Sequence, residues 1–91
     1  MKFMITYTFK SASRDEAIAR FKKTGGKPPA GATLVGRWTA VDLSSGVVLL
    51  DASDAKVLTE FALMWSDLMD LRAVAVVDDG ELVETLQRAG R

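Results

Sequence analysis

Apolar and polar residues follow two different periods along this chain, and each period predicts a type of element. Residues Lys2–Phe9 are rich in β-branched and aromatic side chains and contain no Gly or Pro, which predicts a strand. Apolar side chains then recur at helical spacing over residues 17–21, and we expect this helix to begin at a capping box over Ser13–Glu16. Gly25 should end the helix in a left-handed conformation. Arg20 and its basic neighbours would then lie in water.

A hairpin and a second helix are predicted next. The strand-like segments Thr33–Val41 and Val47–Asp51 flank the turn-forming residues Asp42–Gly46. Ser53 is expected to cap the following helix, because apolar residues recur at helical spacing over residues 57–69. This second helix has the most regular apolar face in the chain.

The C-terminal part adds one strand and one short helix. Leu71–Val77 is a mostly apolar run typical of a strand, and Asp78–Glu81 has the capping-box pattern of a helix start. The element order is therefore β-α-β-β-α-β with an extra C-terminal helix, which predicts an α+β fold of the ferredoxin-like sandwich type. No linker or internal repeat divides the chain, so residues 1–91 are expected to form a single domain.

The strands are more apolar than a sheet with one face in water requires. Val47–Leu50 and Val74–Val77 are apolar at every position, whereas a sheet with helices on one face should alternate apolar and polar residues. A bare second face would be a large exposed apolar patch. We therefore expect a homodimer in which a partner's sheet covers that face. The alternative is that the C-terminal helix folds back over it.

The face on which each strand residue lies depends on register. The residues expected to face the helices are Phe3, Ile5, Tyr7 and Trp38. The residues expected on the other face are Thr6, Thr8 and Arg37. Because side chains alternate along a strand, a shift of one residue would reverse this assignment.

Composition excludes much of the usual chemistry of active sites. The chain has no Cys and no His, which excludes disulfides, thiol chemistry, His- or Cys-built metal sites and Ser-His-Asp or Cys-His catalysis. No three acidic residues cluster at metal-ligand spacing, so we expect no metal and no other cofactor. The 12 basic and 12 acidic residues cancel and no apolar run approaches a membrane span, so neither nucleic acid nor membrane is an expected partner. We expect a cytoplasmic protein.

Five residues are the candidates for ligand binding, and most have a structural alternative. Tyr7 could form a hydrogen bond inside a pocket, although a tyrosine at this position is usually a core residue with its hydroxyl at the rim. Arg37 could bind a carboxylate or, as we favour, form an ion pair across the dimer. Trp38 is expected in the core, and Asp42 also fits ordinary turn chemistry. Thr39 completes the set.

Several short segments are distinctive when they are taken together and in order: Met1–Met4, Thr24–Gly26 with Pro28-Pro29, Gly36–Trp38, Trp65–Leu68 and Asp78-Asp79. They resemble a family of short bacterial proteins catalogued as domain of unknown function 3303, and the resemblance spans nearly the whole chain. It implies a ferredoxin-like fold of the dimeric α+β barrel type and no established activity. The family pattern commonly has a histidine after the Arg-Trp pair, where this chain has Thr39. Any chemical role of that histidine would be absent here.

Three functions are compatible with these observations. The first is a homodimeric domain that binds a small, partly apolar molecule between the sheet and the helices or at the dimer interface, with Arg37 and Tyr7 as polar anchors. The second is a cofactor-independent enzyme that uses Tyr7, Arg37, Trp38 and Asp42, because the implied dimeric α+β barrel type includes monooxygenases and isomerases. Without histidine its base would have to be a carboxylate or a tyrosine, which disfavours the enzyme. The third is a structural or regulatory dimerisation module without a ligand.

Overall fold

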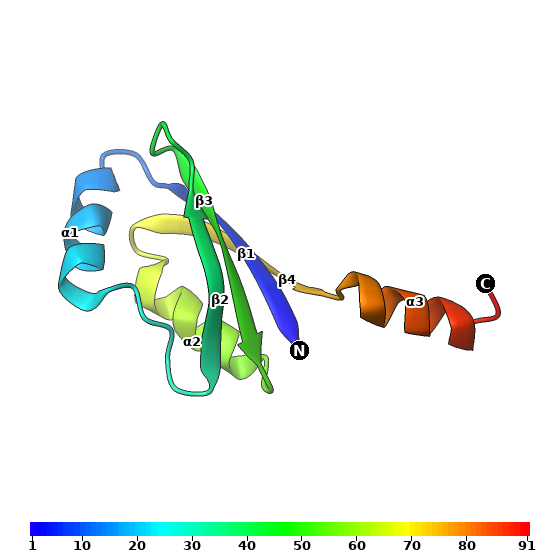
Figure 1. The fold of residues 1–91 in the computed structure, drawn as a ribbon. Coiled ribbons are helices and arrows are strands. Elements are labelled where there is room, and N and C mark those ends of the chain that lie inside the picture. The colour runs from blue at the N-terminus through cyan, green and yellow to red at the C-terminus, as the bar shows by residue number, and fades with distance from the viewer.

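Seven elements follow one another in the predicted order, and the computed structural model describes all of them within residues 1–91 (Figure 1). Their bounds are β1 (Lys2–Phe9), α1 (Arg14–Thr24), β2 (Ala32–Thr39), β3 (Ser45–Ala52), α2 (Lys56–Trp65), β4 (Met69–Val76) and α3 (Asp79–Arg88). Helices α1 and α2 cover one face of a four-stranded sheet, and α3 extends away from the body (Figure 1). The α+β, ferredoxin-like prediction is therefore confirmed.

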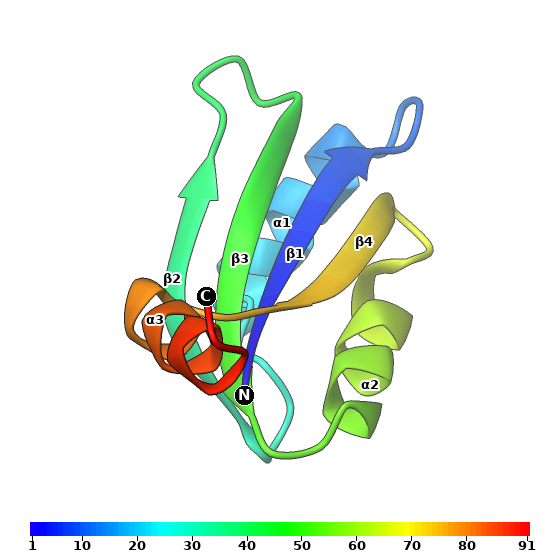
Figure 2. The ribbon, with the colours of Figure 1, turned by 90° about the vertical axis from the view of Figure 1, so that its right-hand side faces the viewer.

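The sheet is antiparallel, with the strand order β2-β3-β1-β4 (Figure 2). The first strand of the sequence is thus a central strand, and β1 pairs along its length with both β3 and β4. Ile5 of β1, for example, lies opposite Val48 of β3 and Ala73 of β4. A central strand has no free edge, which explains why β1 carries β-branched and aromatic residues without Gly or Pro.

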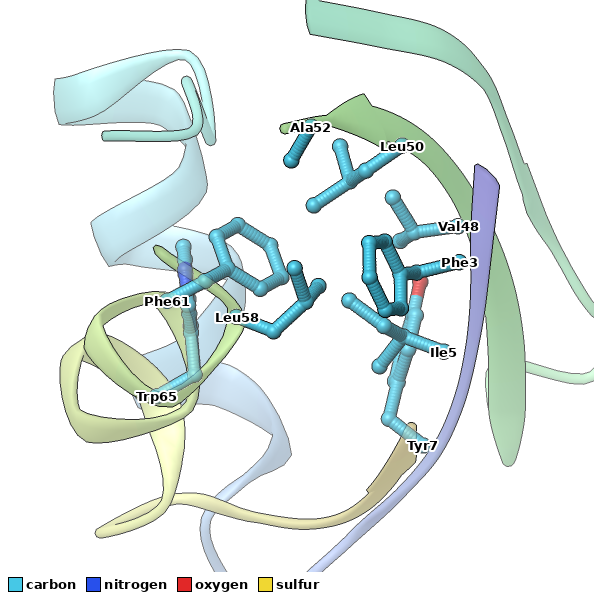
Figure 3. Packing of buried hydrophobic residues seen from close by; sticks show 9 residues of the cluster. All are labelled: Phe3, Ile5, Tyr7, Val48, Leu50, Ala52, Leu58, Phe61 and Trp65. Carbon is cyan, nitrogen blue, oxygen red and sulfur yellow. The ribbon is translucent and has the colours of Figure 1, made fainter. Parts of the chain in front are cut away.

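The core lies between the sheet and α2 (Figure 3). Its nine buried residues are Phe3, Ile5 and Tyr7 from β1, Val48, Leu50 and Ala52 from β3, and Leu58, Phe61 and Trp65 from α2. The predicted faces of β1 and α2 are confirmed. Leu50 has no exposed surface at all, so we expect burial of this side chain alone to stabilise the fold by about 1.5 to 3 kcal/mol.

The predicted face of β2 is wrong, and a β-bulge is the reason. Leu34 lies opposite Leu50, but after an irregularity between Leu34 and Gly36 the pairing continues with Arg37 opposite Val48. Continuing the Leu34 register without the bulge would place Trp38 on the helix side. The extra residue reverses the alternation. Arg37 therefore faces the helices, while Trp38 lies on the outer face with 59% of its surface exposed.

The predicted capping box at the start of α1 does not form. The hydroxyl of Ser13 instead lies 2.6 Å from the carbonyl oxygens of both Lys10 and Leu68, to either of which its single O–H can donate, and makes no cap contact. Ser13 is buried, so its hydroxyl ties the start of α1 to the segment that follows α2. The end of α1 is as predicted, because Gly25 adopts the left-handed conformation at φ 72°.

Of the other two helix starts, that of α2 differs from its prediction and that of α3 agrees with it. Helix α2 begins at Lys56 rather than next to Ser53, and the carboxylate of Asp54 accepts a hydrogen bond from the Lys56 amide at 2.8 Å. The capping box at the start of α3 is confirmed. The Asp78 carboxylate accepts from the Glu81 amide at 2.8 Å, and the Glu81 carboxylate accepts from the Asp78 amide at 3.1 Å.

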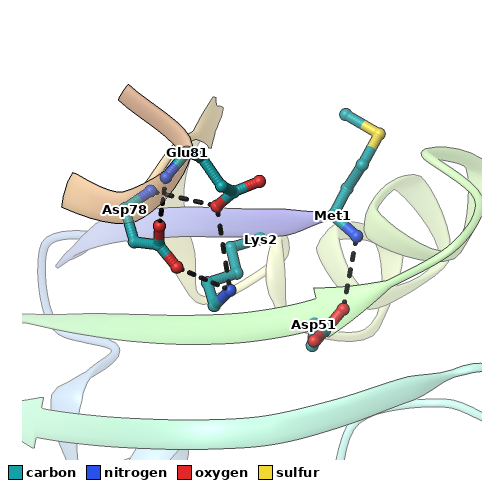
Figure 4. Close-up of polar contacts among 5 residues, drawn as sticks. All are labelled: Met1, Lys2, Asp51, Asp78 and Glu81. Carbon is teal, nitrogen blue, oxygen red and sulfur yellow. Dashed lines mark hydrogen bonds and ion pairs between the residues drawn. The ribbon is translucent and has the colours of Figure 1, made fainter. Parts of the chain in front are cut away.

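Helix α3 does not fold back over the sheet, and none of its residues is buried. Its first turn is held by Lys2, whose ammonium group lies 3.4 Å from the Asp78 carboxylate and 3.9 Å from that of Glu81 (Figure 4). The amino terminus is separately paired with Asp51 at 3.3 Å (Figure 4). The projecting helix gives the chain a radius of gyration of 15.0 Å, compared with about 12 Å for a compact chain of this length.

Candidate functional site

A cavity of about 430 Å³ lies between the helix-facing side of the sheet and helices α1 and α2. Eleven of the thirteen residues that line it are hydrophobic, and the other two are Arg37 and Thr39. The buried residues Val48 and Trp65 lie in its wall, whereas Phe21, Thr39 and Leu43 are exposed and mark its opening. The cavity therefore has an apolar interior and a mixed rim.

A small residue on α1 keeps this cavity open. Ala17 is the one fully buried residue of α1 and lines the cavity, with only 1% of its surface exposed. Ile18 and Phe21, which flank it at helical spacing, line the cavity as well. A larger side chain at position 17 would extend into space that is now empty, since a buried side chain has no other direction to take.

Tyr7 and Thr39 place two hydroxyl groups together in the wall of the cavity. The Tyr7 hydroxyl lies 3.4 Å from the Thr39 hydroxyl, and the two residues come from β1 and β2. They meet because β3, the strand between them, has Gly46 at this point in the register. A Cβ at Gly46 would overlap the Tyr7 hydroxyl, so the glycine makes room for the tyrosine ring.

Arg37 is half-buried in the wall of the same cavity. Its guanidinium group donates hydrogen bonds to the carbonyl oxygens of Gly25, at 3.4 Å, and Gly26, and lies 5.5 Å from the centre of the Phe21 ring. Gly26 has a positive φ of 61°, and a Cβ there would lie 2.5 Å from an Arg37 nitrogen. The loop after α1 therefore requires glycine, and Arg37 fastens that loop to the sheet.

A second arginine ties α1 to the end of α2 and to the segment that follows it. Arg20 of α1 donates two hydrogen bonds to the Asp67 carboxylate, at 2.9 and 2.7 Å, and one to the Met64 carbonyl oxygen at 2.7 Å. Its guanidinium group also lies 5.5 Å from the Trp65 ring centre. Hydrogen bonding between the two partners lowers the pKa of Asp67 and raises that of Arg20. Arg20 is partly exposed, as expected for a residue on the water side of α1, but it is paired with Asp67 rather than free in water.

The structure brings together three of the five candidate residues. Tyr7, Arg37 and Thr39 line the cavity, whereas Trp38 lies on the outer face of the sheet. Asp42 lies in the turn between β2 and β3, where its carboxylate accepts hydrogen bonds from the Ser44 amide at 3.0 Å and from the Ser44 hydroxyl at 2.6 Å. These bonds lower the pKa of Asp42. Arg37 faces the helices and not the outer face of the sheet, where we expected it to form an ion pair with a partner chain.

A ligand site between the sheet and the helices was among the expectations from the sequence, but of the residues that line this cavity only Tyr7, Arg37 and Thr39 were named as candidates. Phe61 and Trp65, which belong to the apolar face predicted over residues 57–69, lie in the core and also line the open space. The signal that could have indicated the cavity is Ala17, a small residue at the position of α1 that points most directly inward.

No group of three or more His, Cys, Asp or Glu side chains is arranged to hold a metal ion. None of the helices combines the length and apolarity needed to cross a membrane.

Solved structures with a similar fold include Rv0793 from Mycobacterium tuberculosis and an uncharacterized NIPSNAP domain protein from Burkholderia xenovorans. Rv0793 is 12% identical with a TM-score of 0.52, over 86% of this chain and 96% of its own. The NIPSNAP domain protein is 14% identical with a TM-score of 0.51, over 87% of this chain and 97% of its own. At these identities the likeness concerns the fold alone. No curated protein matches the chain, whereas a family model described as "Domain of unknown function (DUF3303)" matches residues 1–90.

Proposed function

This chain belongs to the DUF3303 family of unknown function, and we propose that it is a small-molecule-binding domain whose ligand occupies the cavity between the sheet and the helices. The cavity carries the proposal. Its volume of about 430 Å³ lies in the range of known ligand sites, which are mostly apolar with a few convergent polar groups. Tyr7, Thr39 and Arg37 supply those polar groups.

The lining favours binding over catalysis. No carboxylate lines the cavity and the chain has no histidine or cysteine, so the usual general bases and nucleophiles are not available at this position. A well-packed protein interior leaves few voids larger than a water molecule. An opening of this size, lined by buried aromatic side chains, therefore favours a ligand over a purely structural module.

The ligand should be small and partly apolar. The cavity volume equals that of roughly 14 liquid water molecules, which suits a molecule of one or two rings or a medium alkyl chain. Such a ligand would contact Phe21, Phe61 and Trp65 and place one polar group near the hydroxyls of Tyr7 and Thr39. Most of its affinity would come from apolar surface removed from water.

A pair of matched variants tests this proposal. Ala17→Leu fills the cavity from α1, whereas Ala19→Leu makes the same substitution at an exposed position of the same helix. We expect the uncharged fluorescent probe N-phenyl-1-naphthylamine to bind the wild type, to bind Ala17→Leu at least tenfold more weakly, and to bind Ala19→Leu like the wild type, at about 1.4 kcal/mol per tenfold change. Equal binding by both variants, or none by the wild type, would refute the proposal.

We further propose that the binding domain is a homodimer formed through the outer face of the sheet. Met4 lies opposite Leu49 and Val74 on that face, and the Trp38 ring covers Gly36 beside them, since a Cβ at Gly36 would overlap it. Met4, Val74 and Trp38 are all exposed in the single chain. An apolar surface of this kind on a sheet typically marks an interface.

Helix α3 supports the same dimer. In Figure 2 it stands in front of the sheet, on the face opposite to α1, and its apolar residues Leu82, Val83 and Leu86 are exposed. A helix of ten residues is marginal in water without tertiary contacts. In a two-fold symmetric dimer each protomer's α3 would pack on its partner, because the same patch meets itself.

The cytoplasm remains the location that we propose for this cysteine-free chain.

Native mass spectrometry of the purified protein tests the dimer and the ligand together. We expect a dimer that carries reproducible extra mass. A dimer without extra mass would favour the structural or regulatory module, and a monomer at every concentration would refute the proposed interface.

A further inference from the structure

Two arginines of this chain have nearly the same surroundings but differ in one respect. Arg20 and Arg37 each place a guanidinium group 5.5 Å from the centre of an aromatic ring, Trp65 and Phe21 respectively. Each also donates to a main-chain carbonyl oxygen. Arg20 has in addition a carboxylate partner, Asp67, whereas Arg37 has none within ion-pair distance.

The missing partner matters because Arg37 is not on the open surface. The other arginines without a carboxylate partner are Arg72, Arg88 and Arg91, and all three are exposed. Arg37 is half-buried and lines the cavity. Carbonyl oxygens satisfy hydrogen bonds but do not neutralise its charge, and a partly buried charge without a counter-ion is unfavourable.

The guanidinium group also has donors to spare. Of its five N–H groups, one on each terminal nitrogen is engaged by Gly25 and Gly26, so three are free of protein acceptors. Thr39 lies two residues further along the same face of β2 and carries a hydroxyl, which lies 3.4 Å from that of Tyr7. A planar anion at this end of the cavity could therefore meet a fork of N–H donors and two hydroxyl groups.

From this arrangement we infer that the ligand is an apolar carboxylate, with its hydrocarbon part among the aromatic residues and its carboxylate on Arg37. The inference rests on the proposed binding function and specifies the chemical class of the ligand. Arg37 would form a two-point contact with the carboxylate, which is the geometry that a guanidinium group matches best. The ligand carboxylate would then neutralise the charge of Arg37, as the Asp67 carboxylate neutralises that of Arg20.

Two probes of the same shape, one negatively charged and one uncharged, test the inference. 2-Naphthoate carries the carboxylate, and 2-naphthamide is its uncharged counterpart with the same ring system. We expect calorimetric titration of the wild type at neutral pH to show at least tenfold tighter binding of the acid, as a charge-assisted pair of hydrogen bonds provides. This preference should shrink as salt is raised, because the rim is open to solvent.

Variants of the two arginines separate this role from a structural one. Arg37→Met should abolish the preference for the acid while the amide still binds. Arg20→Met should leave the preference for the acid unchanged. If Arg37→Met does not fold, Arg37→Lys replaces it and should weaken the preference, because an ammonium group lacks the planar fork. Equal binding of acid and amide by the wild type would refute the carboxylate while leaving the binding function intact. Binding of neither probe would overturn both.

Discussion

Replacement of Leu82 in α3 tests the proposed dimer most directly. We expect Leu82→Gln to weaken dimerisation, because Leu82 lies on the apolar stripe of a helix none of whose residues is buried in the single chain. Glu84→Gln is the matched control. It introduces the same residue into the same helix, on the face opposite to the stripe, and should leave dimerisation unchanged.

The size of the effect follows from exposure and symmetry. Leu82 has 46% of its surface exposed in the single chain, and burial of a whole leucine side chain is worth about 1.5 to 3 kcal/mol, so burial of the exposed half contributes about 0.7 to 1.4 kcal/mol. In a two-fold dimer the side chain occurs twice. Leu82→Gln should therefore raise the dimer dissociation constant about 10- to 100-fold.

Sedimentation velocity over a series of concentrations measures this constant for the wild type and both variants. Circular dichroism of the same samples shows whether α3 loses helical content as the dimer dissociates, which an unsupported ten-residue helix should do. A wild-type dimer with the same dissociation constant as Leu82→Gln would show that α3 takes no part in the interface. In that case the stripe on α3 would need another explanation.

Three further changes have defined outcomes. Leu50→Ala should lower the free energy of unfolding in urea by about 2 to 5 kcal/mol, because Leu50 is completely buried; a loss below about 1 kcal/mol would contradict the described core. Gly46→Ala should displace the Tyr7 ring, which should destabilise the fold by about 1 to 3 kcal/mol and weaken N-phenyl-1-naphthylamine binding. The Asp67 pKa is lowered by Arg20, so the ion pair stabilises the fold above the ordinary carboxyl pKa and is lost as the pH falls. Arg20→Met should therefore destabilise at pH 6 and have a shrinking effect below about pH 4, and a pH-independent difference in urea midpoints would contradict the pair.

The order of elements and the face of β1 could be predicted because they depend on local periodicity. Phe3, Ile5 and Tyr7 alternate with polar or exposed residues, and a strand without irregularities keeps that alternation. The same reasoning failed on β2 because the bulge between Leu34 and Gly36 has no signature in the pattern of apolar residues. One inserted residue exchanged the positions of Arg37 and Trp38, and with them the candidate site.

The starts of α1 and α2 and the size of the cavity could not be predicted, because they depend on tertiary contacts that the local sequence does not indicate. Ser13 fits the pattern of a capping box, yet the carbonyl oxygen of Leu68, 55 residues away, competes successfully for its hydroxyl. Asp67 fits an ordinary turn residue until α1 brings Arg20 to it. The size of the cavity depends on the distance between the sheet and the helices, which the apolar periodicity of the sequence does not determine. Ala17, a small residue on the inner face of α1, is the one local feature that indicates it.

The central position of β1 also determines when this chain can fold on the ribosome. Strand β1 ends at Phe9, but β1 pairs only with β3 and β4, which are made after it, and β4 ends at Val76. At ordinary translation rates the interval between these two residues takes about 3 to 13 s. During that time this central strand has no complete set of partners, so β1 is the segment on which nascent-chain chaperones should act.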